Sequence, residues 1–229
     1  MTEGTPRHVG YIIDGNRRWA KKHGIPVYEG HLAGYNSVKE VVLETFDQNV
    51  KYVSVYLFST ENWKRGQEEI GNIMNLALRM LTADINIFQD NNIRFLWSGV
   101  EQGLSKSILK ALKKAEEVTK DNTRGTFNLC FNYGGQLEIA DACKKIIQQG
   151  ISPDEITPEL VSQYIYNSAI PPVDLIVRTS GEQRISNFML WRAAYAELLF
   201  IEKLWPDMTK DDVSIILKEY IQRDRRIGG

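Results

Sequence analysis

The sequence predicts an α/β protein in one domain over residues 1–229, with a central, mostly parallel six-stranded sheet flanked by helices. Six short apolar runs have the length and the bounding turn residues of buried strands. Helical patterns separate these runs, and strand–helix alternation is typical of a parallel sheet with helices on both faces. The 229 residues, 43% of them hydrophobic, suffice for one sizeable core.

The predicted strands are residues 8–13, 52–58, 93–97, 127–131, 174–177 and 198–201. In open parallel sheets, ligands bind beyond the carboxyl ends of the strands. We therefore expect Asp14, Ser59 and Arg178, each of which ends or follows a predicted strand, to lie along one edge of the sheet.

Apolar residues recur at helical spacing between the predicted strands. These patterns cover residues 38–46, 105–120, 136–149, 158–167 and 213–221. A further helical segment is expected with Phe188, Trp191 and Tyr195 on one side, ending near Glu197.

The helical segment 68–89 has a wide apolar surface. Its apolar residues are Ile70, Ile73, Met74, Leu76, Ala77, Leu78, Met80, Leu81, Ile85 and Phe88. A helix that covers a sheet normally has one apolar face and a polar back. The extra width allows a second apolar contact, with a partner chain or an apolar ligand, although packing in the core or a dimer also explains it.

Composition and charge narrow the function classes. A formal net charge of −1 argues against extended nucleic-acid binding, so any anion site must be local. No run approaches about 18 apolar residues, and Met1–Arg7 has no signal-peptide character. Cys130 and Cys143 form no metal or redox motif, and their apolar surroundings predict reduced core thiols in a cytoplasmic protein.

The stretch after the first predicted strand carries the first chemical cluster. Gly15 and Asn16 tolerate the backbone of a tight strand-to-helix turn, which points N–H groups at a ligand above the strand end. Arg17 and Arg18 suit phosphate oxygens. Magnesium that bridges Asp14 to a diphosphate would explain a carboxylate among these groups. The alternative is that Asp14 caps the next helix beside two solvated arginines.

The loop after the second predicted strand carries the second cluster. Its residues are Ser59, Thr60, Glu61, Asn62, Trp63, Lys64 and Arg65. The hydroxyl and amide groups can hydrogen-bond a ligand without adding charge, and the basic residues suit phosphate. Ser59 or Thr60 could instead cap the following helix, whereas Trp63 in a polar loop is harder to explain that way.

The stretch from Arg178 to Ser186 follows the fifth predicted strand and carries the third cluster. Two arginines, three hydroxyl groups and a glycine in these nine residues can clamp a diphosphate. Glu182 would orient an arginine, for that purpose or in a structural ion pair. Surface solvation is the alternative. Together with the wide apolar helix, the three clusters indicate a diphosphate carried on a hydrophobic tail.

Motifs for several other chemistries are absent. The sequence contains no Walker phosphate loop, no dinucleotide Gly-x-Gly-x-x-Gly, no His-Glu-x-x-His and no Gly-x-Ser-x-Gly elbow. His8, His23 and His31 show no ligand spacing, which argues against a transition-metal site.

Five stretches resemble the cis-prenyltransferase family, which includes undecaprenyl diphosphate synthase. They are Asp14–Ala20, Phe58–Trp63, Asn132–Gly135, Arg178–Phe188 and Trp191–Glu197. The resemblance implies condensation of isopentenyl diphosphate with an allylic diphosphate, farnesyl or geranylgeranyl diphosphate, to build a cis-polyprenyl diphosphate with Mg²⁺ as cofactor. It also implies a homodimer, an apolar tunnel between sheet and helices, and peripheral contact with a membrane through the lipid product.

The resemblance also implies roles for individual residues. Asp14 matches the magnesium-linked catalytic aspartate, Glu197 matches an acid linked to metal binding, and Asn62 matches a position near the reacting carbons. The positions that match the family's diphosphate-binding and neighbouring residues are Gly15, Asn16, Arg17, Arg18, Trp19, His31, Ser59, Thr60, Glu61, Trp63, Arg65, Arg178, Arg184, Ser186 and Arg226. Within that set, the resemblance assigns the isopentenyl diphosphate clamp to Arg178, Arg184 and Ser186.

Two positions depart from the common family pattern. Arg17 stands where many bacterial members have glycine. Val27 stands where many members have an arginine that helps to hold the allylic diphosphate, and Arg17 would supply that charge.

At the chain end, Arg226–Gly228 resembles a family motif that reaches across the dimer to the neighbour's diphosphate. A solvated helix terminus is the alternative for this tail.

Two other functions fit parts of the pattern. A non-catalytic subunit of a heteromeric prenyltransferase typically loses the aspartate motif, whereas Asp14 and both arginine clusters are intact here. A diphosphate hydrolase would need a water-activating base, and none is obvious.

The span 63–93 resembles in length the same span of family members that make medium-chain products. This resemblance predicts a medium-to-long product, with Ala77, Leu78 and Leu81 in the tunnel wall.

Overall fold

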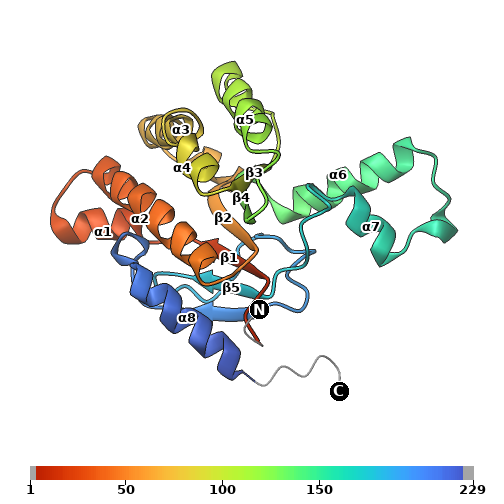
Figure 1. Ribbon diagram of the computed structural model, residues 1–229. Helices are drawn as coiled ribbons and strands as arrows, with labels where there is room; N and C mark the ends of the chain where they lie inside the picture. Colours follow the sequence, from red (N-terminus) through yellow and green to blue (C-terminus); the bar gives the residue numbers. More distant parts are fainter. Residues whose placement is uncertain (1–3, 224–229) are drawn as a thin grey trace.

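The computed structural model describes residues 4–223 and contains a six-stranded sheet (Figure 1). The strands are β1 (His8–Ile12), β2 (Tyr52–Ser59), β3 (Ile93–Ser98), β4 (Gly125–Tyr133), β5 (Leu175–Arg178) and β6 (Glu197–Phe200). Their order is β3-β4-β2-β1-β5-β6, and every neighbouring pair is parallel. All six predicted strands are therefore confirmed, and the sheet is parallel throughout.

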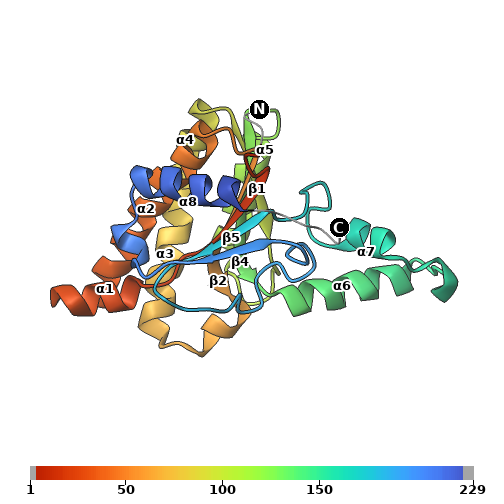
Figure 2. The ribbon, with the colours of Figure 1, turned by 90° about the horizontal axis from the view of Figure 1, so that it is seen from below.

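The helices gather mainly on one side of this sheet. They are α1 (Asn16–His23), α2 (Val27–Asp47), α3 (Gln67–Thr82), α4 (Ile85–Asp90), α5 (Lys106–Val118), α6 (Gly135–Gln148), α7 (Pro158–Tyr164) and α8 (Lys210–Gln222), with the 3₁₀ helices η1 (Thr60–Lys64), η2 (Pro153–Glu155) and η3 (Trp205–Asp207). Figure 2 shows α6 and α7 extending from the body of the molecule as an arm. No helix within residues 4–223 is long and apolar enough to cross a bilayer.

The segment predicted as one helix over residues 68–89 forms two helices, α3 and α4, separated at Ala83 and Asp84. The Asp84 carboxylate accepts hydrogen bonds from Tyr35 and, at 3.3 Å, from Lys39, so it anchors this break to α2. Much of the wide apolar surface of α3 is core, because α3 packs against both α2 and α5.

Alternating strand residues face two different environments. The larger core lies between the sheet and the helices and includes Val9, Tyr11, Val53, Val55, Phe95, Phe127, Leu129, Leu175 and Val177. A smaller cluster lies on the other face and includes Ile12, Tyr56, Cys130, Ile176 and Phe188. A Cβ atom on Gly10 would lie 2.8 Å from the ring of Phe188, so the glycine makes room for this packing.

The segment around Phe188, which covers the second face of the sheet, is not a helix. The prediction of a helix that includes Phe188 and Tyr195 is therefore wrong. Ser186, Asn187 and Met189 have positive φ angles of 44°, 65° and 45°, which a right-handed helix does not contain. These turns direct Phe188 onto the sheet, where its ring stacks on Tyr56 with centroids 4.8 Å apart. The backbone here follows the packing of one aromatic side chain rather than helical periodicity.

The two cysteines differ in environment. Cys130 is buried in β4, as predicted, but Cys143 is exposed. Cys143 lies on α6, which projects from the body, and this projection leaves much of the helix surface in solvent (Figure 2). The expectation that both are core thiols is therefore wrong for Cys143.

A chain of buried polar groups crosses the second face of the sheet. His8 Nε2 lies 2.8 Å from the Ser54 hydroxyl, and this hydroxyl accepts a hydrogen bond from Asn128 Nδ2 at 3.0 Å. The Ser98 hydroxyl continues the chain by donating to Asn128 at 2.8 Å. Burial away from water lowers the pKa of His8 from 6.5 to about 4, because the charged imidazolium is poorly solvated there.

We expect the free energy of unfolding to fall as the pH drops from 6.5 to about 4. In this window the unfolded chain binds a proton at His8 that the folded chain does not, so acid favours unfolding. The loss from this one group is on the order of 3 kcal/mol. Urea unfolding at pH 7 and pH 4.5 measures it. A His8→Gln variant, which cannot titrate, should lose clearly less, and equal losses in both proteins would contradict this assignment.

Candidate active site

A cleft of about 620 Å³ opens at the carboxyl edge of the sheet, between the ends of β1 and β2 and the helices α2 and α3. Its volume lies within the usual range for small-molecule sites. The predicted site residues that line it are Asp14, Gly15, Asn16, Arg17, Arg18, His31, Ser59, Glu61, Asn62, Arg65, Arg178 and Ser186. The structure therefore brings residues of all three sequence clusters into one cleft.

Asp14 and Arg178 form an ion pair at the centre of this edge. They follow or end neighbouring strands, β1 and β5, and Arg178 donates to Asp14 Oδ2 from Nε at 2.8 Å and from Nη2 at 2.6 Å. Arg178 is buried, and its Nη1 also donates to the Ser186 hydroxyl at 2.7 Å and to the Arg184 carbonyl. No side chain caps the start of α1, so the alternative of a capping Asp14 is wrong.

A tight turn sets the position of Asp14. Gly15 has a φ of 122°, and a Cβ atom there would lie 3.0 Å from the backbone nitrogen of Trp205. That nitrogen donates to the Asp14 carbonyl at 3.0 Å, and the Thr179 hydroxyl donates to the same carbonyl at 2.6 Å. Gly15 thus provides both the left-handed backbone and the close approach that this turn requires.

The Glu69 carboxylate lies close to three basic side chains near the mouth of the cleft. Arg65 and His31 lie 3.1 and 3.2 Å from Glu69 Oε1, and Arg17 lies 3.9 Å from Oε2. Burial lowers the pKa of His31 despite the opposing effect of Glu69, so this imidazole is neutral at pH 7. Sequence reasoning missed Glu69, although an acid four residues after Arg65 at a helix start is a usable signal.

Glu182 holds two arginines near the mouth of the cleft. Arg18 donates to the Ser180 carbonyl at 2.9 Å and to Glu182 Oε1 at 2.8 Å. Arg184 donates to Glu182 Oε2 at 2.5 Å, but its side chain is 60% exposed and it does not line the cleft. Glu182 therefore orients two arginines, as the sequence suggested for one.

Three further predicted substrate-binding residues, Trp19, Thr60 and Trp63, lie outside the cleft lining. The Trp19 indole donates to Asp207 at 2.6 Å, which joins α1 to η3. The Trp63 indole donates to Asn132 Oδ1 at 2.8 Å and thereby supports the loop that contains it. Ser59 and Asn62 line the cleft and also form the capping box of η1, so the capping alternative holds for Ser59.

Glu197 lies at the amino end of β6, away from the carboxyl edge that carries the cleft. It pairs with Leu175, three residues before Arg178, a separation of about 10 Å along the strand. Its carboxylate accepts a hydrogen bond from Arg223 at 2.9 Å. The carboxylates of Asp14 and Glu197 therefore do not meet within one chain, and the role of Glu197 in metal binding stays a prediction. Arg226 lies outside the described residues.

Comparison with known proteins identifies the family. The family model "Putative undecaprenyl diphosphate synthase" matches residues 12–228. The chain belongs to this family. It is a cis-prenyltransferase, as the motifs suggested.

The relatives and solved structures agree with this membership. A trans,polycis-polyprenyl diphosphate synthase ((2Z,6E)-farnesyl diphosphate specific) of Thermobifida fusca is 42% identical over 98% of this chain and 81% of its own length. An isoprenyl transferase of Thermotoga maritima is 42% identical over 98% of this chain and 97% of its own. Lavandulyl diphosphate synthase from Lavandula x intermedia, solved with dimethylallyl diphosphate, matches 99% of this chain and 100% of its own with a TM-score of 0.95 and 32% identity. A probable undecaprenyl diphosphate synthase from Campylobacter jejuni matches 100% of both chains, with a TM-score of 0.84 and 31% identity.

The donor set of this cis-prenyltransferase fits a magnesium ion that is shared with a substrate. Within residues 4–223, no group of three or more His, Cys, Asp or Glu side chains could hold a metal by itself. Asp14 lines the cleft, and its Oδ1 stands outside the ion pair with Arg178. Mg²⁺ usually binds through one or two carboxylates and the phosphates of a substrate. Asp14 is the residue that would hold it.

The inner end of the cleft in this cis-prenyltransferase is apolar. It is formed by Ile13, Tyr35, Val38, Leu57, Ile73 and Leu76. Ile12 and Tyr56, which belong to the smaller cluster on the other face of the sheet, also line the cleft. The predicted wall residues Ala77, Leu78 and Leu81 do not line it, because the cleft meets α3 at Ile73 and Leu76, and Ala77 and Leu81 are buried in the core. The apolar stripe showed which helix faces the cleft, but helical periodicity cannot tell at which turn the cleft ends.

Proposed function

We propose that this cis-prenyltransferase condenses isopentenyl diphosphate with an allylic diphosphate, farnesyl or geranylgeranyl diphosphate, and repeats the step to build a cis-polyprenyl diphosphate, the precursor of a lipid carrier. The observation that carries the proposal is one cleft with a basic mouth and an apolar interior. A diphosphate on a prenyl tail has the same two-part character. The relative specific for (2Z,6E)-farnesyl diphosphate and the structural neighbour with dimethylallyl diphosphate support this substrate class.

The two sides of the mouth suit two diphosphates. Arg17, Arg18 and the amino end of α1 would bind the allylic diphosphate, since helix N-termini and guanidinium groups both favour phosphate oxygens. Arg178 and Ser186 would bind isopentenyl diphosphate across the cleft. The ion pair with Asp14 would fix the direction of the Arg178 guanidinium before substrate arrives.

The chemistry requires stabilisation of a leaving group and protection of a cation. As the allylic carbon–oxygen bond breaks, negative charge grows on the departing diphosphate, where Arg17 and Arg18 would stabilise it. A magnesium ion held by Asp14 would supply further electrostatic stabilisation of that diphosphate. The apolar walls formed by Val38 and Ile73 would keep water from the allylic carbocation until the double bond of isopentenyl diphosphate attacks it and the resulting cation loses a proton to form the new double bond.

Product analysis tests the proposal. Purified protein is incubated with radiolabelled isopentenyl diphosphate, Mg²⁺ and either farnesyl or geranylgeranyl diphosphate, and the extracted lipids are sized. We expect labelled products longer than the primer. Release of diphosphate from the primer without extension would instead indicate a hydrolase. No reaction without a second subunit would indicate a scaffold protein.

The volume of the apolar end should limit product length. An Ile73→Phe substitution adds bulk to the cleft wall, so we expect the product distribution to shift to shorter chains. Ile85→Phe is the matched control, because Ile85 is buried in α4 and does not line the cleft. Separation of the radiolabelled products by length measures the shift. An unchanged distribution with Ile73→Phe would place the growing tail elsewhere.

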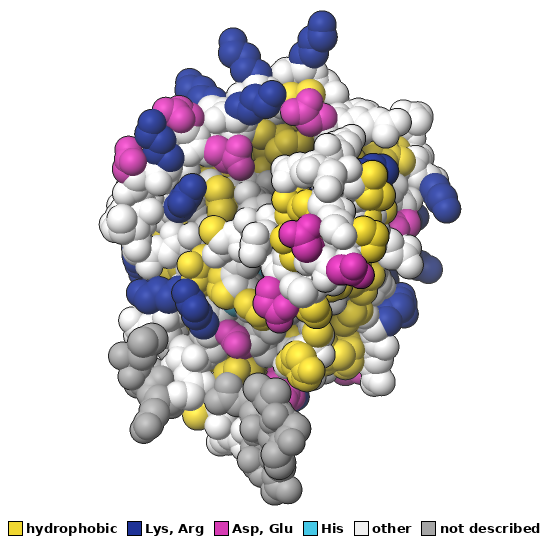
Figure 3. Space-filling view, turned by 90° about the vertical axis from the view of Figure 1, so that its right-hand side faces the viewer, with side chains coloured by type: hydrophobic (Ala, Val, Ile, Leu, Met, Phe, Trp, Pro, Cys, Tyr) yellow, Lys and Arg dark blue, Asp and Glu magenta, His cyan; other side chains and the backbone are white. Residues whose placement is uncertain are grey.

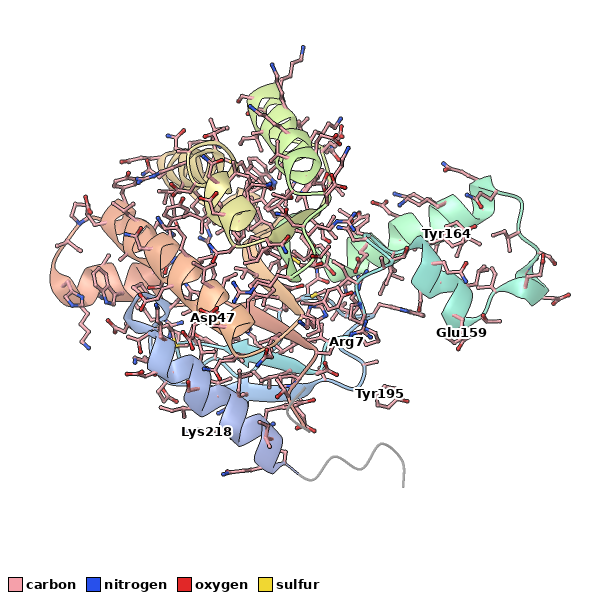
Figure 4. All side chains as sticks on the ribbon, viewed as in Figure 1. Arg7, Asp47, Glu159, Tyr164, Tyr195 and Lys218 are labelled. Carbon is pink, nitrogen blue, oxygen red and sulfur yellow. The ribbon has the colours of Figure 1, made fainter. Side chains whose placement is uncertain are left out.

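We also propose that the protein is a homodimer. Figure 3 shows hydrophobic side chains gathered on the face from which α6 and α7 project. Tyr195 is 81% exposed and points away from the body of the molecule (Figure 4). Leu198 is also exposed. Exposed apolar patches of this kind mark interaction surfaces. Sedimentation equilibrium of the purified protein distinguishes a dimer from a monomer.

A further inference from the structure

The turn between β4 and α6, residues 132–135, takes no part in the chemistry described above. It lies between two segments at the mouth of the cleft. One is the η1 loop, defined here as residues 59–65, and the other is the arginine segment, residues 178–189. Both segments supply residues that line the cleft, and both contact the β4–α6 turn.

Asn187 joins these three parts of the chain. Its carbonyl accepts a hydrogen bond from the Gly135 N–H at 2.8 Å, and its side-chain Oδ1 accepts one from the Gln136 N–H at 2.8 Å. Its Nδ2 donates to Glu61 Oε1 in the η1 loop at 3.0 Å. A positive φ of 65° lets the backbone and the side chain of Asn187 reach all these partners.

The glycines of the turn leave space for these contacts. A Cβ atom on Gly134 would lie 2.8 Å from the Thr60 hydroxyl and 3.0 Å from Asn187 Nδ2. A Cβ atom on Gly135 would lie 2.9 Å from the Asn187 carbonyl. The φ of Gly134 is −155°, which other residues also adopt, so at this position close packing, rather than backbone conformation, explains the glycine.

Two side-chain hydrogen bonds tie the η1 loop to the end of β4 and to the arginine segment. Trp63 donates to Asn132 Oδ1 at 2.8 Å, which ties the loop to the end of β4. Glu61 accepts from Asn187, which ties the loop to the arginine segment. Without the second contact, the loop would keep its anchor on β4 but lose its connection to the segment that holds Arg178 and Ser186.

We propose that Asn187 is a positioning residue whose hydrogen bond to Glu61 holds the η1 loop against the arginine segment, so that these two segments keep a fixed separation at the mouth. This hydrogen bond would fix the positions of Ser59 and Asn62, which line the cleft from the η1 loop, relative to Arg178. Its catalytic consequence rests on the function proposed above, because the arginine segment is where isopentenyl diphosphate would bind.

Hydrogen exchange of the substrate-free protein tests the link independently of catalysis. Asn187→Gly removes the side chain but tolerates the positive φ, and Gly134→Ala pushes a methyl group against both Thr60 and Asn187. We expect amides of residues 60–65 to exchange several-fold faster in both variants. Asn92→Gly is the control, since Asn92 also has a positive φ, 55°, but lies at the opposite edge of the sheet. Unchanged exchange in Asn187→Gly would overturn the proposal.

Kinetics then test the catalytic consequence. We expect Asn187→Gly to raise the KM for isopentenyl diphosphate by about five- to tenfold, the effect of losing one hydrogen bond of ordinary net strength, with kcat within about twofold. Glu61→Ala should act similarly, and Glu61→Gln, which keeps an acceptor oxygen, should recover part of the loss. The double variant Asn187→Gly with Glu61→Ala should be no worse than the worse single variant. Additive effects would overturn the proposal. Absence of turnover in the unmodified protein would refute the proposed function, while hydrogen exchange would still decide the link.

Discussion

Replacing Asp14 with alanine is expected to lower kcat by a factor on the order of 10²–10³ or more. Asp14 is a carboxylate of the cleft, and it forms an ion pair with the buried Arg178. Its loss removes the group that would hold magnesium beside the leaving diphosphate. It also removes the acceptor that fixes the Arg178 guanidinium. Steady-state rates of the purified variant at saturating Mg²⁺ measure the effect.

Asp14→Asn separates these two contributions. The amide oxygen can still accept hydrogen bonds from Arg178, so the local geometry should persist, but the neutral group binds magnesium poorly. We therefore expect Asp14→Asn to retain more thermal stability than Asp14→Ala and to be nearly as inactive. Near-unmodified turnover by either variant would contradict the assigned role of the carboxylate.

Arg178→Lys is expected to lower kcat/KM for isopentenyl diphosphate by about 10²-fold, comparable to removing one preorganised donor. The guanidinium bonds three groups at once, namely Asp14, the Ser186 hydroxyl and the Arg184 carbonyl. A lysine keeps the charge but lacks the planar fork that reaches all three. Initial-rate measurements with varied isopentenyl diphosphate at saturating primer give this value.

Arg184→Lys provides the comparison for that variant. Arg184 is mostly exposed and does not line the cleft, so its replacement should cost less than Arg178→Lys. A loss below about fivefold in Arg178→Lys, or equal losses in both variants, would show that the fork geometry of Arg178 is unimportant.

The sequence predicts the edge of the sheet that carries the cleft, and the physical reason is simple. Apolar runs alternating with helices specify a parallel sheet, and the carboxyl ends of parallel strands share one edge. Asp14, Ser59 and Arg178 each follow or end a strand, so their meeting in one cleft could be predicted without coordinates. Only the strand boundaries and the order of residues are needed for that step.

Other features depend on tertiary contacts that periodicity does not encode. The aromatic spacing of Phe188 and Tyr195 resembles a helix, but three positive φ angles make that segment a series of turns. Trp19 looked like a ligand-binding aromatic residue, yet its indole finds Asp207, which is remote in sequence. Asn187 escaped notice as a site residue because its partners lie at the start of α6 and in the η1 loop, whose proximity only the fold creates.

A crystal structure with isopentenyl diphosphate and an unreactive thio analogue of farnesyl diphosphate would test directly whether both diphosphates bind in this cleft. We expect one diphosphate beside Arg17 and Arg18, and the other beside Arg178 and Ser186. We also expect the farnesyl tail to lie along Ile73 in the apolar end of the cleft. Diphosphates bound away from the carboxyl edge of the sheet, or a tail outside this cleft, would contradict this expectation.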